Sequence, residues 1–488
     1  MISRLSKITL EQSTQLIKQL GTLLYDHDLQ IDSRYVNENS IFCAYPGFAN
    51  DGRKYISDVI MKHVCAIIYE ASDNLKIQYD NCYSVNNLVL HVGLLASAKY
   101  NNPSTAYNVI GITGTNGKTS ISYWVSQAYQ QLNKKVGIIG TTGIGVYPEV
   151  KYSDSTTPNP IVLQHALYQF KQQHVDIVAM EVSSHSLVQG RVNGINFTTA
   201  VFSNLTQDHL DYHVTMENYY LAKKELFYWY GLKNAIINVD DKYGDRLYQE
   251  LLNDKLPLNI IDYGIEHGSL RASNIYLTIN GIEFTVSYRT ETIKLYLNVL
   301  GYFNIYNVLA VIGVLLVDGY SLTNINEIIK NITTVLGRMD VIRNANKPLV
   351  VVDFAHTPDS LEKALLTLKQ IENKGRIYCV FGCGGNRDKT KRPQMGGIAT
   401  KLADLVIITS DNPRYESAID IINDIISGIN KDNYQVIENR ELAIKAALTM
   451  AKPNDIVLIA GKGHETTQEI NGVKSYFSDY DVARKYLG

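Results

Sequence analysis

The stretch VIGITGTNGKTSISYWVSQAYQ, residues 109–130, decides how this chain is interpreted. It starts with an apolar run, continues with the glycine-rich segment GTNGKT and ends in a helix-like stretch. A strand, a glycine-rich loop and a helix in this order are typical of a phosphate-binding loop, because backbone N–H groups and the helix start can face a polyphosphate. We therefore expect a nucleotide site at residues 114–119.

The residue types of this loop fit that role. Gly114 and Gly117 let the backbone approach phosphates, Lys118 can reach the outer phosphates, and the Thr119 hydroxyl can hold Mg²⁺. The strict GxxxxGK[ST] pattern fails, since Ile112 stands where its first glycine would be. The alternative is a glycine-rich turn with an exposed lysine, which the flanking strand and helix disfavour.

Apolar runs of strand length alternate with helix-like stretches along the whole chain, which predicts an α/β fold with mostly parallel sheets. The runs are VCAIIYE, YNVIGIT, KVGIIGTT, DIVAMEVSS, KNAIINVD, KPLVVVDFA, RIYCVFGCGG, DLVIITSD and DIVLIAGKG. At about 100–200 residues per domain, 488 residues indicate several domains. A polar break at residues 99–108 and a turn-rich stretch before residue 349 predict domains at 1–104, 105–336 and 337–488.

Charge and cysteine content exclude several classes of protein. Lys and Arg number 46 against 48 Asp and Glu, so we expect no nucleic-acid partner. The longest apolar run, 308–317, is too short for a membrane span and the N-terminus lacks a signal-peptide core, so we expect a cytoplasmic protein. The five cysteines contain no CxxC pair, which disfavours a disulfide framework or zinc knuckle.

Two further residues follow strands that can end beside the loop. Glu181 follows DIVAM and His209 follows the strand-like run AVFSNLT. A carboxylate with an imidazole suits a divalent metal. The competing interpretations are a capping or ion-paired carboxylate for Glu181 and a hydrogen-bonded structural residue for His209.

A series of segments in order along the chain resembles the Mur ligases. They are TGTNGKT (113–119), EVSSH (181–185), NLTQDHLDYH (204–213), GYFNIYN (301–307), GRMD (337–340), DFAHTPDSLEKAL (353–365), FGCGGNRDKTKRP (381–393), SDNPR (410–414) and AGKGHE (460–465). The resemblance implies a small α/β N-terminal domain for the UDP end of the substrate, a central P-loop ATPase and a C-terminal Rossmann-like domain. It also implies a monomeric enzyme that uses ATP and Mg²⁺ to add meso-2,6-diaminopimelate to UDP-N-acetylmuramoyl-L-alanyl-D-glutamate.

The resemblance also implies roles for residues around the nucleotide. Glu181 would bridge two Mg²⁺ ions, held further by Thr119 and by His209, and Lys223 would be carbamylated. The alternative for Lys223 and its neighbour Lys224 is a pair of solvated helix lysines. The remaining implied ATP contacts are Thr115, Asn116, Asn304, Arg338 and Asp353, although Asn304 is also a candidate helix cap.

The other two substrates have implied contacts of their own. For the UDP-linked dipeptide these are Ser33, Thr156, Thr157, Ser183, Gln189 and Arg191. The alternative for each of them, taken alone, is an ordinary polar loop residue that contacts no ligand. Diaminopimelate has two amino-acid heads, so its pocket needs a cation for the distal carboxylate, which Arg414 supplies, and an acceptor for an ammonium, which Glu465 supplies. Arg387, Asp411, Asn412 and Gly461 complete that pocket by resemblance. An Asn-Pro turn with an exposed Arg414 is the alternative.

Other functions share parts of this pattern. A lysine-adding Mur ligase would leave Arg414 unpaired, which is costly for a desolvated charge. A folylpolyglutamate synthase has similar ligase chemistry, but SDNPR and IDSR (31–34) disfavour it. A nucleotide-dependent binding protein or motor, or a kinase, would use the loop without needing an amino-acid pocket.

Overall fold

The computed structural model describes residues 7–47, 50–72, 75, 77–151, 153, 155–278, 280–335, 337–371 and 375–487. It groups the chain into two compact units, Met1–Arg271 with Asn307–Ser321, and Ala272–Tyr306 with Leu322–Gly488. The predicted domain boundaries stay predictions, and residue 336, at the second of them, lies outside the described residues.

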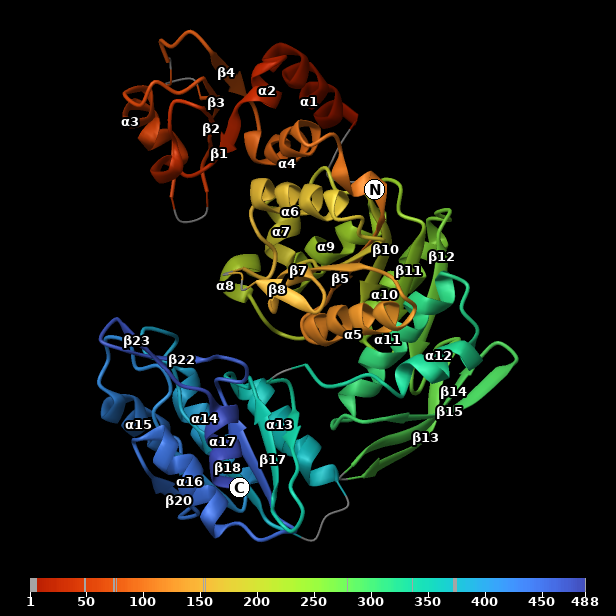
Figure 1. Cartoon of the computed structure of the whole chain (residues 1–488), viewed down its shortest axis with the longest axis vertical. Coiled ribbons are helices and arrows are strands. Elements are labelled where there is room, and N and C mark those ends of the chain that lie inside the picture. The colour runs from red at the N-terminus through yellow and green to blue at the C-terminus, as the bar shows by residue number, and fades with distance from the viewer. Residues whose placement is uncertain are drawn as a thin grey trace. The chain divides into compact units, whose positions relative to one another are not determined.

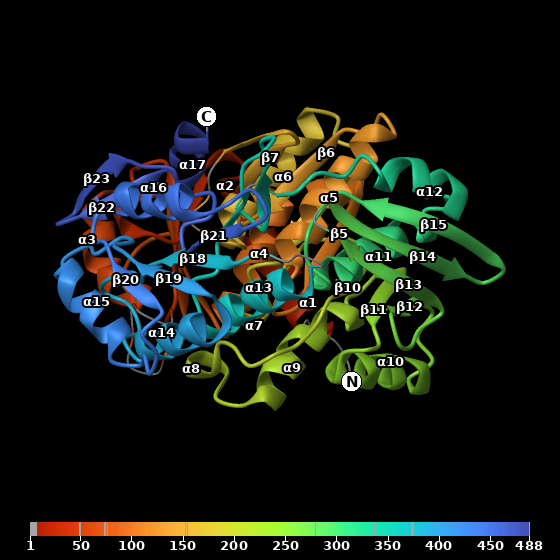
Figure 2. The same ribbon diagram turned by 90° about the horizontal axis from the view of Figure 1, so that it is seen from below.

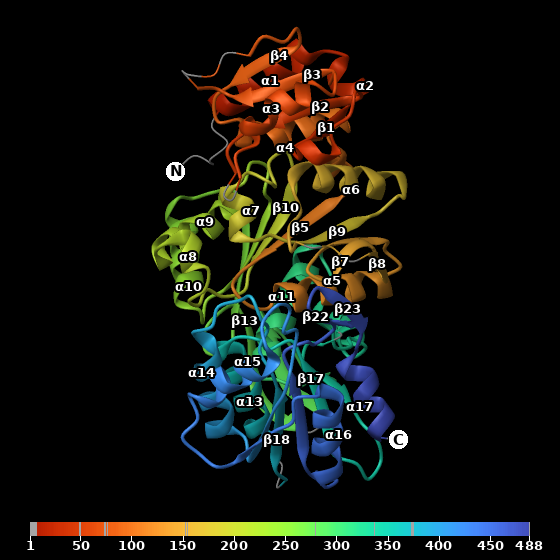
Figure 3. The same ribbon diagram turned by 90° about the vertical axis from the view of Figure 1, so that its left-hand side faces the viewer.

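The first unit opens with a small α/β sheet in the order β1-β2-β3-β4, in which every neighbouring pair is parallel (Figure 3). Its elements are α1 (Lys7–Leu20), α2 (Leu23–Asp26), β1 (Asp28–Gln30), β2 (Ser40–Ala44), α3 (Ile56–Ile60), β3 (Ala66–Glu70), β4 (Cys82–Val85) and α4 (Leu88–Lys99). Successive residues of β2 point to opposite faces, so Ile41 packs with α1 and α4 whereas Phe42 packs with α3. Both faces are therefore covered by helices.

A larger sheet follows in the first unit, in the order β8-β7-β6-β9-β5-β10-β11-β12 (Figure 1). Its elements are β5 (Asn108–Thr113), α5 (Lys118–Gln131), β6 (Val136–Gly140), β7 (Gly143–Val146), β8 (Glu149–Lys151), α6 (Pro160–Gln172), β9 (Ile177–Glu181), α7 (Ser184–Val188), β10 (Phe197–Phe202), α8 (Leu210–His213), α9 (Met216–Lys224), β11 (Asn234–Asn238), α10 (Lys242–Asn253) and β12 (Asn259–Gly264). The neighbouring strands β6, β9, β5, β10, β11 and β12 run parallel to one another, whereas β7 and β8 form an antiparallel edge of the sheet. Parallel order brings the carboxyl ends of β5, β6, β9 and β10 to one edge.

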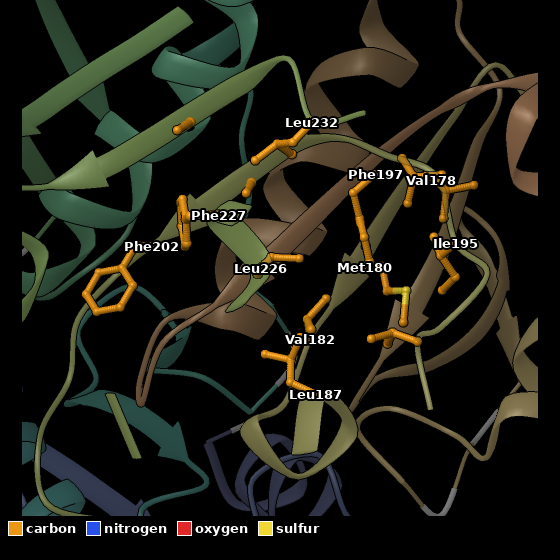
Figure 4. Packing of buried hydrophobic residues seen from close by; sticks show 14 of the residues in the cluster. Val178, Met180, Val182, Leu187, Ile195, Phe197, Phe202, Leu226, Phe227 and Leu232 are labelled. Carbon is orange, nitrogen blue, oxygen red and sulfur yellow. The ribbon is translucent and has the colours of Figure 1, made fainter. Parts of the chain in front are cut away.

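The core on one face of this sheet fixes those strand ends. Met180 of β9 and Phe197 of β10 are fully buried, and they pack among side chains from the following loops and helices (Figure 4). Leu187 of α7 and Leu226 belong to the same cluster. The polar residues just beyond β9 and β10 are therefore attached to a close-packed support.

The second unit contains an antiparallel strand pair and a mostly parallel sheet that has helices on both faces. The bounds of its elements are β13 (Leu270–Thr278), β14 (Gly281–Tyr288), β15 (Glu291–Leu297), α11 (Phe303–Val317), α12 (Leu322–Ile329), β16 (Asp340–Ile342), β17 (Leu349–Asp353), α13 (Pro358–Gln370), β18 (Ile377–Phe381), α14 (Lys391–Leu402), β19 (Leu405–Ile408), α15 (Ala418–Ile426), β20 (Tyr434–Val436), α16 (Arg440–Met450), β21 (Ile456–Ala460), β22 (Thr467–Ile470), β23 (Val473–Tyr476) and α17 (Asp479–Leu487). Of these, β13 begins and α11 ends in the first unit.

The C-terminal sheet has the order β16-β17-β21-β18-β19-β20, and all its pairs but β16–β17 are parallel. Val351 packs with α13, α14 and α15 on one face, whereas Val350 and Val352 pack with α16 and α17 on the other. The two helical layers are visible on either side of the sheet in Figure 2. This is the Rossmann-like arrangement expected for the region.

Several sequence predictions are confirmed. The apolar runs form the parallel strands β3, β5, β6, β9, β11, β17, β18, β19 and β21. The five cysteines are free. The apolar run 308–317 lies in α11, and within the described residues no helix meets the length and hydropathy needed to cross a bilayer.

Candidate functional site

The predicted phosphate loop connects the end of β5 to the start of α5. Gly114 and Gly117 both have positive φ, at 149° and 89°. A Cβ at Gly117 would lie 2.3 Å from Oδ1 of Asn307, so glycine is needed for space as well as for backbone conformation. The Nζ of Lys118 donates to the carbonyl oxygens of Gly114 and Thr115, at 3.0 and 2.8 Å. The ammonium thus lies over its own loop.

The residues after β10 hold this loop in shape. The N–H of Asn116 donates to Oδ1 of Asn204 at 3.0 Å, and its carbonyl oxygen accepts from the Ser203 hydroxyl at 2.6 Å. A Cβ at Gly114 would lie 1.9 Å from the Ser203 hydroxyl. Neither Ser203 nor Asn204 was among the predicted site residues, although both stand in the strand-like run AVFSNLT that precedes His209.

Glu181 lies at the end of β9 and is fully buried. Its Oε2 accepts from the hydroxyl groups of Thr119 at 3.0 Å and Thr141 at 3.2 Å, and its Oε1 accepts from the Thr141 N–H at 2.8 Å. A Cβ at Gly140 would lie 2.3 Å from Oε1. Thr141 and Gly140 were not among the predicted site residues, although both stand at the end of the predicted strand KVGIIGTT.

The pairing of Thr119 with Glu181 fits Mg²⁺, which takes oxygen ligands and is commonly bound through one or two carboxylates together with substrate phosphates. Within the described residues, no group of three or more His, Cys, Asp or Glu side chains is placed to hold a metal ion. Thr119 and Glu181 fit a metal that is bound together with a nucleotide.

His209 lies just before α8 with a positive φ of 53°. About half of its side chain is exposed, and its Nε2 lies 3.4 Å from Oδ2 of Asp208. Its ring centroid is 4.9 Å from that of His185 and 6.1 Å from that of Tyr219, whose hydroxyl lies 3.3 Å from Oγ1 of Thr115. The structure therefore places His209 in an aromatic cluster beside the loop.

Lys223 and Lys224 lie at the end of α9 in very different surroundings. Lys223 is 1% exposed, and its Nζ donates to the Gly114 carbonyl oxygen at 2.8 Å. Burial lowers the pKa of Lys223 well below its ordinary value, and the nearby positive charge of Lys118 adds to this effect. Lys224 instead forms an ion pair with Glu250 at 2.6 Å. Only Lys223 faces the phosphate loop.

Most residues predicted to contact the dipeptide lie together. The Thr157 hydroxyl donates to the Glu181 carbonyl oxygen at 2.9 Å and accepts from the Ser183 N–H at 3.1 Å. Arg191 donates to the Thr157 carbonyl oxygen at 2.9 Å and to Oε1 of Gln189 at 2.8 Å. Burial lowers the pKa of Arg191.

Two other predicted contacts occupy different places. The Thr156 hydroxyl lies 3.1 Å from that of Thr141, which joins it to the Glu181 group. Ser33 stands on the N-terminal sheet domain, where its carbonyl oxygen accepts from Nζ of Lys62 at 2.8 Å. The structure does not bring Ser33 into the cluster around Thr157.

The remaining residues that are predicted to contact ATP belong to the second unit. Asp353 ends β17, where its carboxylate accepts from the N–H groups of Met339 at 2.7 Å and Ala355 at 2.9 Å. Burial raises the pKa of Asp353, and the Arg338 charge opposes that shift. The Arg338 guanidinium lies 4.9 Å from the centre of the Phe354 ring.

Asn304 lies in the first turn of α11, is 4% exposed and donates to the Leu300 carbonyl oxygen at 2.7 Å. Asn307, whose amide would meet a Cβ at Gly117, lies one turn further along the same helix face. Asn307 was not among the predicted residues.

The predicted amino-acid pocket gathers at the carboxyl ends of β18, β19 and β21. Arg414 has a φ of 53°, and its Nη1 donates to the Gly385 carbonyl oxygen at 2.7 Å. Its Nε lies 3.6 Å from Oε2 of Glu469. Arg387 is exposed on the loop after β18, and a Cβ at Gly384 would lie within 4 Å of both arginines.

The other pocket residues form a hydrogen-bonded group. Nδ2 of Asn412 donates to Oε2 of Glu465 at 2.9 Å. The Asn412 N–H donates to Oδ1 of Asp411 at 2.7 Å, and a Cβ at Gly461 would lie 2.8 Å from the other Asp411 oxygen. The fully buried Lys462 also belongs to the group, since its Nζ donates to Asn412. Lys462 was not among the predicted site residues, although it stands within the segment AGKGHE.

Comparison with known proteins matches both parts of the chain to one family. The Mur ligase middle domain matches residues 112–315, and the Mur ligase, glutamate ligase domain matches residues 337–463. A protein of Chromobacterium violaceum named UDP-N-acetylmuramoyl-L-alanyl-D-glutamate–2,6-diaminopimelate ligase is 43% identical over 477 residues, which cover 97% of this chain and 96% of that protein.

The chain belongs to the Mur ligase family. A Neisseria meningitidis serogroup B protein with the same name is 44% identical over 94% of each chain. A solved structure with that name has a TM-score of 0.71 at 33% identity and covers 94% of each chain. The predicted membership, the α/β class and the nature of the chain as a Mur-type ligase are thus confirmed.

Proposed function

We propose that this Mur ligase joins meso-2,6-diaminopimelate to the D-glutamate carboxylate of UDP-N-acetylmuramoyl-L-alanyl-D-glutamate, with ATP converted to ADP and phosphate. The observation that carries the proposal is the contact between the Thr119 hydroxyl and the buried Glu181 carboxylate at the end of a phosphate loop. The likeness to relatives that bear the corresponding name supports the choice of substrates.

ATP is needed because a carboxylate does not condense with an amine in water. Phosphorylation converts the carboxylate into an acyl phosphate, whose phosphate can leave when the amine attacks. Bringing the carboxylate to the γ-phosphate requires concentrated positive charge, which Lys118 and the start of α5 supply. Mg²⁺, held by Thr119, Glu181 and His209 together with the nucleotide, would neutralise phosphate charge.

Lys223 supports a second part of the proposal, namely that this lysine is carbamylated. An amine must lose its proton before it can attack CO₂, and burial of Lys223 favours the neutral amine. The carbamate would place an anion beside Gly114 and Thr113. That anion could orient Mg²⁺.

The dipeptide would lie along the Thr157, Ser183 and Arg191 group, which begins at the Glu181 carbonyl. The Arg191 fork is suited to a carboxylate. Ser33, in the 3-10 turn between β1 and β2, would receive the uridine end. We propose the same roles as the sequence predicts for Thr156 and Gln189, and for Asn304, Arg338 and Asp353 at the nucleotide.

For the amino acid we propose the C-terminal group of Arg414, Asn412 and Glu465. Arg414 would pair with the distal carboxylate of diaminopimelate and Glu465 with an ammonium group. Arg387, Asp411 and Gly461 would complete this pocket, as the sequence predicts. Lysine lacks the distal carboxylate and would leave Arg414 without it, which favours diaminopimelate over lysine.

ADP release by the purified chain tests the proposal. We expect release only when ATP, the UDP-linked dipeptide and meso-diaminopimelate are all present, with the tripeptide detected by mass spectrometry. L-Lysine and L-glutamate serve as competing amino acids. Release that continues without the dipeptide would indicate a motor or binding protein, and a stable phosphorylated product would indicate a kinase.

Two further predictions accompany the proposed reaction. A cytoplasmic location suits an enzyme that depends on ATP, and cell fractionation would check it. That the protein is a monomer stays a prediction, which sedimentation of the purified protein would check.

A further inference from the structure

Lys462 is a fully buried lysine directly after β21. Its Nζ donates to Oδ1 of Asn412 at 3.0 Å and to Oε2 of Glu465 at 3.1 Å. Burying an ammonium group is costly unless it is paired and hydrogen-bonded. Both side chains that pair with it belong to the predicted amino-acid pocket.

Lys462 also fixes which way the Asn412 amide faces. An ammonium group can only donate hydrogen bonds, so the amide must present its oxygen to Lys462. The Glu469 N–H donates to the same oxygen at 3.0 Å. The amide nitrogen is thereby turned toward Oε2 of Glu465, at 2.9 Å.

The two oxygens of the Glu465 carboxylate therefore differ in their hydrogen bonding. Oε2 accepts from both Lys462 and Asn412, whereas Oε1 accepts no hydrogen bond from any residue in the described part of the chain. The Glu465 side chain remains 36% exposed. One oxygen is therefore held by the protein and the other remains available to a ligand.

We propose that Lys462 is a positioning residue for the amino-acid substrate, which acts by holding Asn412 and Glu465 so that Oε1 can accept from a substrate ammonium group. The proposal rests on the proposed function, which assigns Asn412 and Glu465 to diaminopimelate. Lys462 itself makes no contact with the substrate in this scheme. Its removal should weaken amino-acid binding more than the chemical step.

The test compares Lys462→Met with wild type in the ADP-release assay. We expect the KM for meso-diaminopimelate to rise roughly tenfold, as for loss of a charge-assisted hydrogen bond. The KM for ATP and kcat should stay within about twofold of wild type, because those steps do not use the Glu465 carboxylate. Lys431→Met, at an exposed lysine of the same unit, is the matched control.

A double-mutant cycle separates positioning from general destabilisation. In a Glu465→Gln background, Lys462→Met should change the KM for diaminopimelate by less than about twofold, because the carboxylate that it positions is already gone. An equal effect in both backgrounds, or an unchanged KM in the single variant, would overturn the proposal. If Lys462→Met does not fold, Lys462→Gln, which is neutral but can still donate, takes its place in the same cycle.

The activity of the wild-type protein separates a failure of the proposed function from a failure of the proposed role of Lys462. A wild-type protein without diaminopimelate-dependent ADP release would overturn both the proposed function and the role of Lys462. An active wild type with an equally active Lys462→Met variant would overturn only the role of Lys462.

Discussion

The Thr119 hydroxyl donates a 3.0 Å hydrogen bond to the Glu181 carboxylate, and so joins the phosphate loop to the end of the neighbouring strand β9. The carboxylate is fully buried, and it accepts hydrogen bonds from the Thr119 and Thr141 hydroxyl groups and from the Thr141 N–H. An anion held in this way attracts a metal ion once phosphates supply the remaining ligands. The pair is therefore a sensitive place to test the mechanism.

Glu181→Gln should abolish most activity while it preserves the shape of the side chain. We expect ADP release to fall by roughly a hundredfold or more, because the amide cannot provide the negative charge that holds Mg²⁺ beside the nucleotide. Initial rates over a range of Mg²⁺ concentrations would measure this. Glu149→Gln, at an exposed position of β8, is the control, and a Glu181→Gln enzyme with wild-type rates would refute the metal role.

Lys223→Ala and Lys224→Ala should have opposite consequences although the residues are adjacent. Lys223→Ala should remove activity, since the buried amine beside Gly114 is the carbamate site. Lys224→Ala should keep activity and lose roughly 1–2 kcal/mol of unfolding free energy, because it breaks the ion pair with Glu250 and the contact with the Tyr228 ring. Rates and thermal unfolding of both variants would be compared.

Depletion of CO₂ tests the modification itself. Wild-type activity should fall in CO₂-depleted buffer and recover when bicarbonate is added. Activity that does not respond to bicarbonate, in a protein whose Lys223→Ala variant is inactive, would show that the lysine acts without carbamylation.

The sequence predicts the parallel strands well because burial on both faces leaves continuous apolar runs. β17 and β21 are examples, and both were located from such runs. β14 and β15 were not among the predicted strands. Buried and less buried residues alternate along β14, so it contains no long apolar run.

The site was predictable where the loop and strand ends define it, and less so where contacts join distant segments. Lys223 and Lys224 are the same residue type at adjacent positions, so the sequence alone cannot tell which one faces the phosphate loop. The orientation of α9 directs Lys223 to Gly114 and Lys224 to Glu250. Thr141 reaches Glu181 across 40 positions of sequence. Lys462 was overlooked because a buried lysine is rare and its partners Asn412 and Glu465 are recognised only in space.

Arg414→Ala should impair the use of diaminopimelate but not the binding of ATP. The guanidinium is the proposed partner of the distal carboxylate, so we expect the KM for diaminopimelate to rise by roughly tenfold or more. ATP affinity, measured by calorimetry, should not change. Arg376→Ala, at an exposed arginine of the same unit, controls for loss of charge. Unchanged discrimination between diaminopimelate and lysine in Arg414→Ala would contradict the proposed pocket.

Glu416→Gln should destabilise the loop that carries Arg414, and the effect should depend on pH. Arg392, which is fully buried, donates to both oxygens of Glu416 at 3.0 Å. This pairing, together with a hydrogen bond from the Asn386 N–H, lowers the pKa of Glu416 from 4.5 to about 2. A pKa that is lower in the folded protein stabilises it above the unfolded value, and that stabilisation is lost as pH falls from about 4.5 to about 2.

Urea unfolding of wild type and Glu416→Gln at a series of pH values would measure this dependence. At pH 7 we expect the variant to be less stable by roughly 1–3 kcal/mol, as for a hydrogen bond to a charged group. The difference should hold down to about pH 5 and then shrink, because Glu416 takes up a proton in the unfolded wild-type chain at a higher pH than in the folded protein, which stabilises the unfolded state. Glu438→Gln, at an exposed position, should show no such trend. A difference that stays constant between pH 5 and pH 3 would mean that the pairing with Arg392 does not control the ionisation of Glu416.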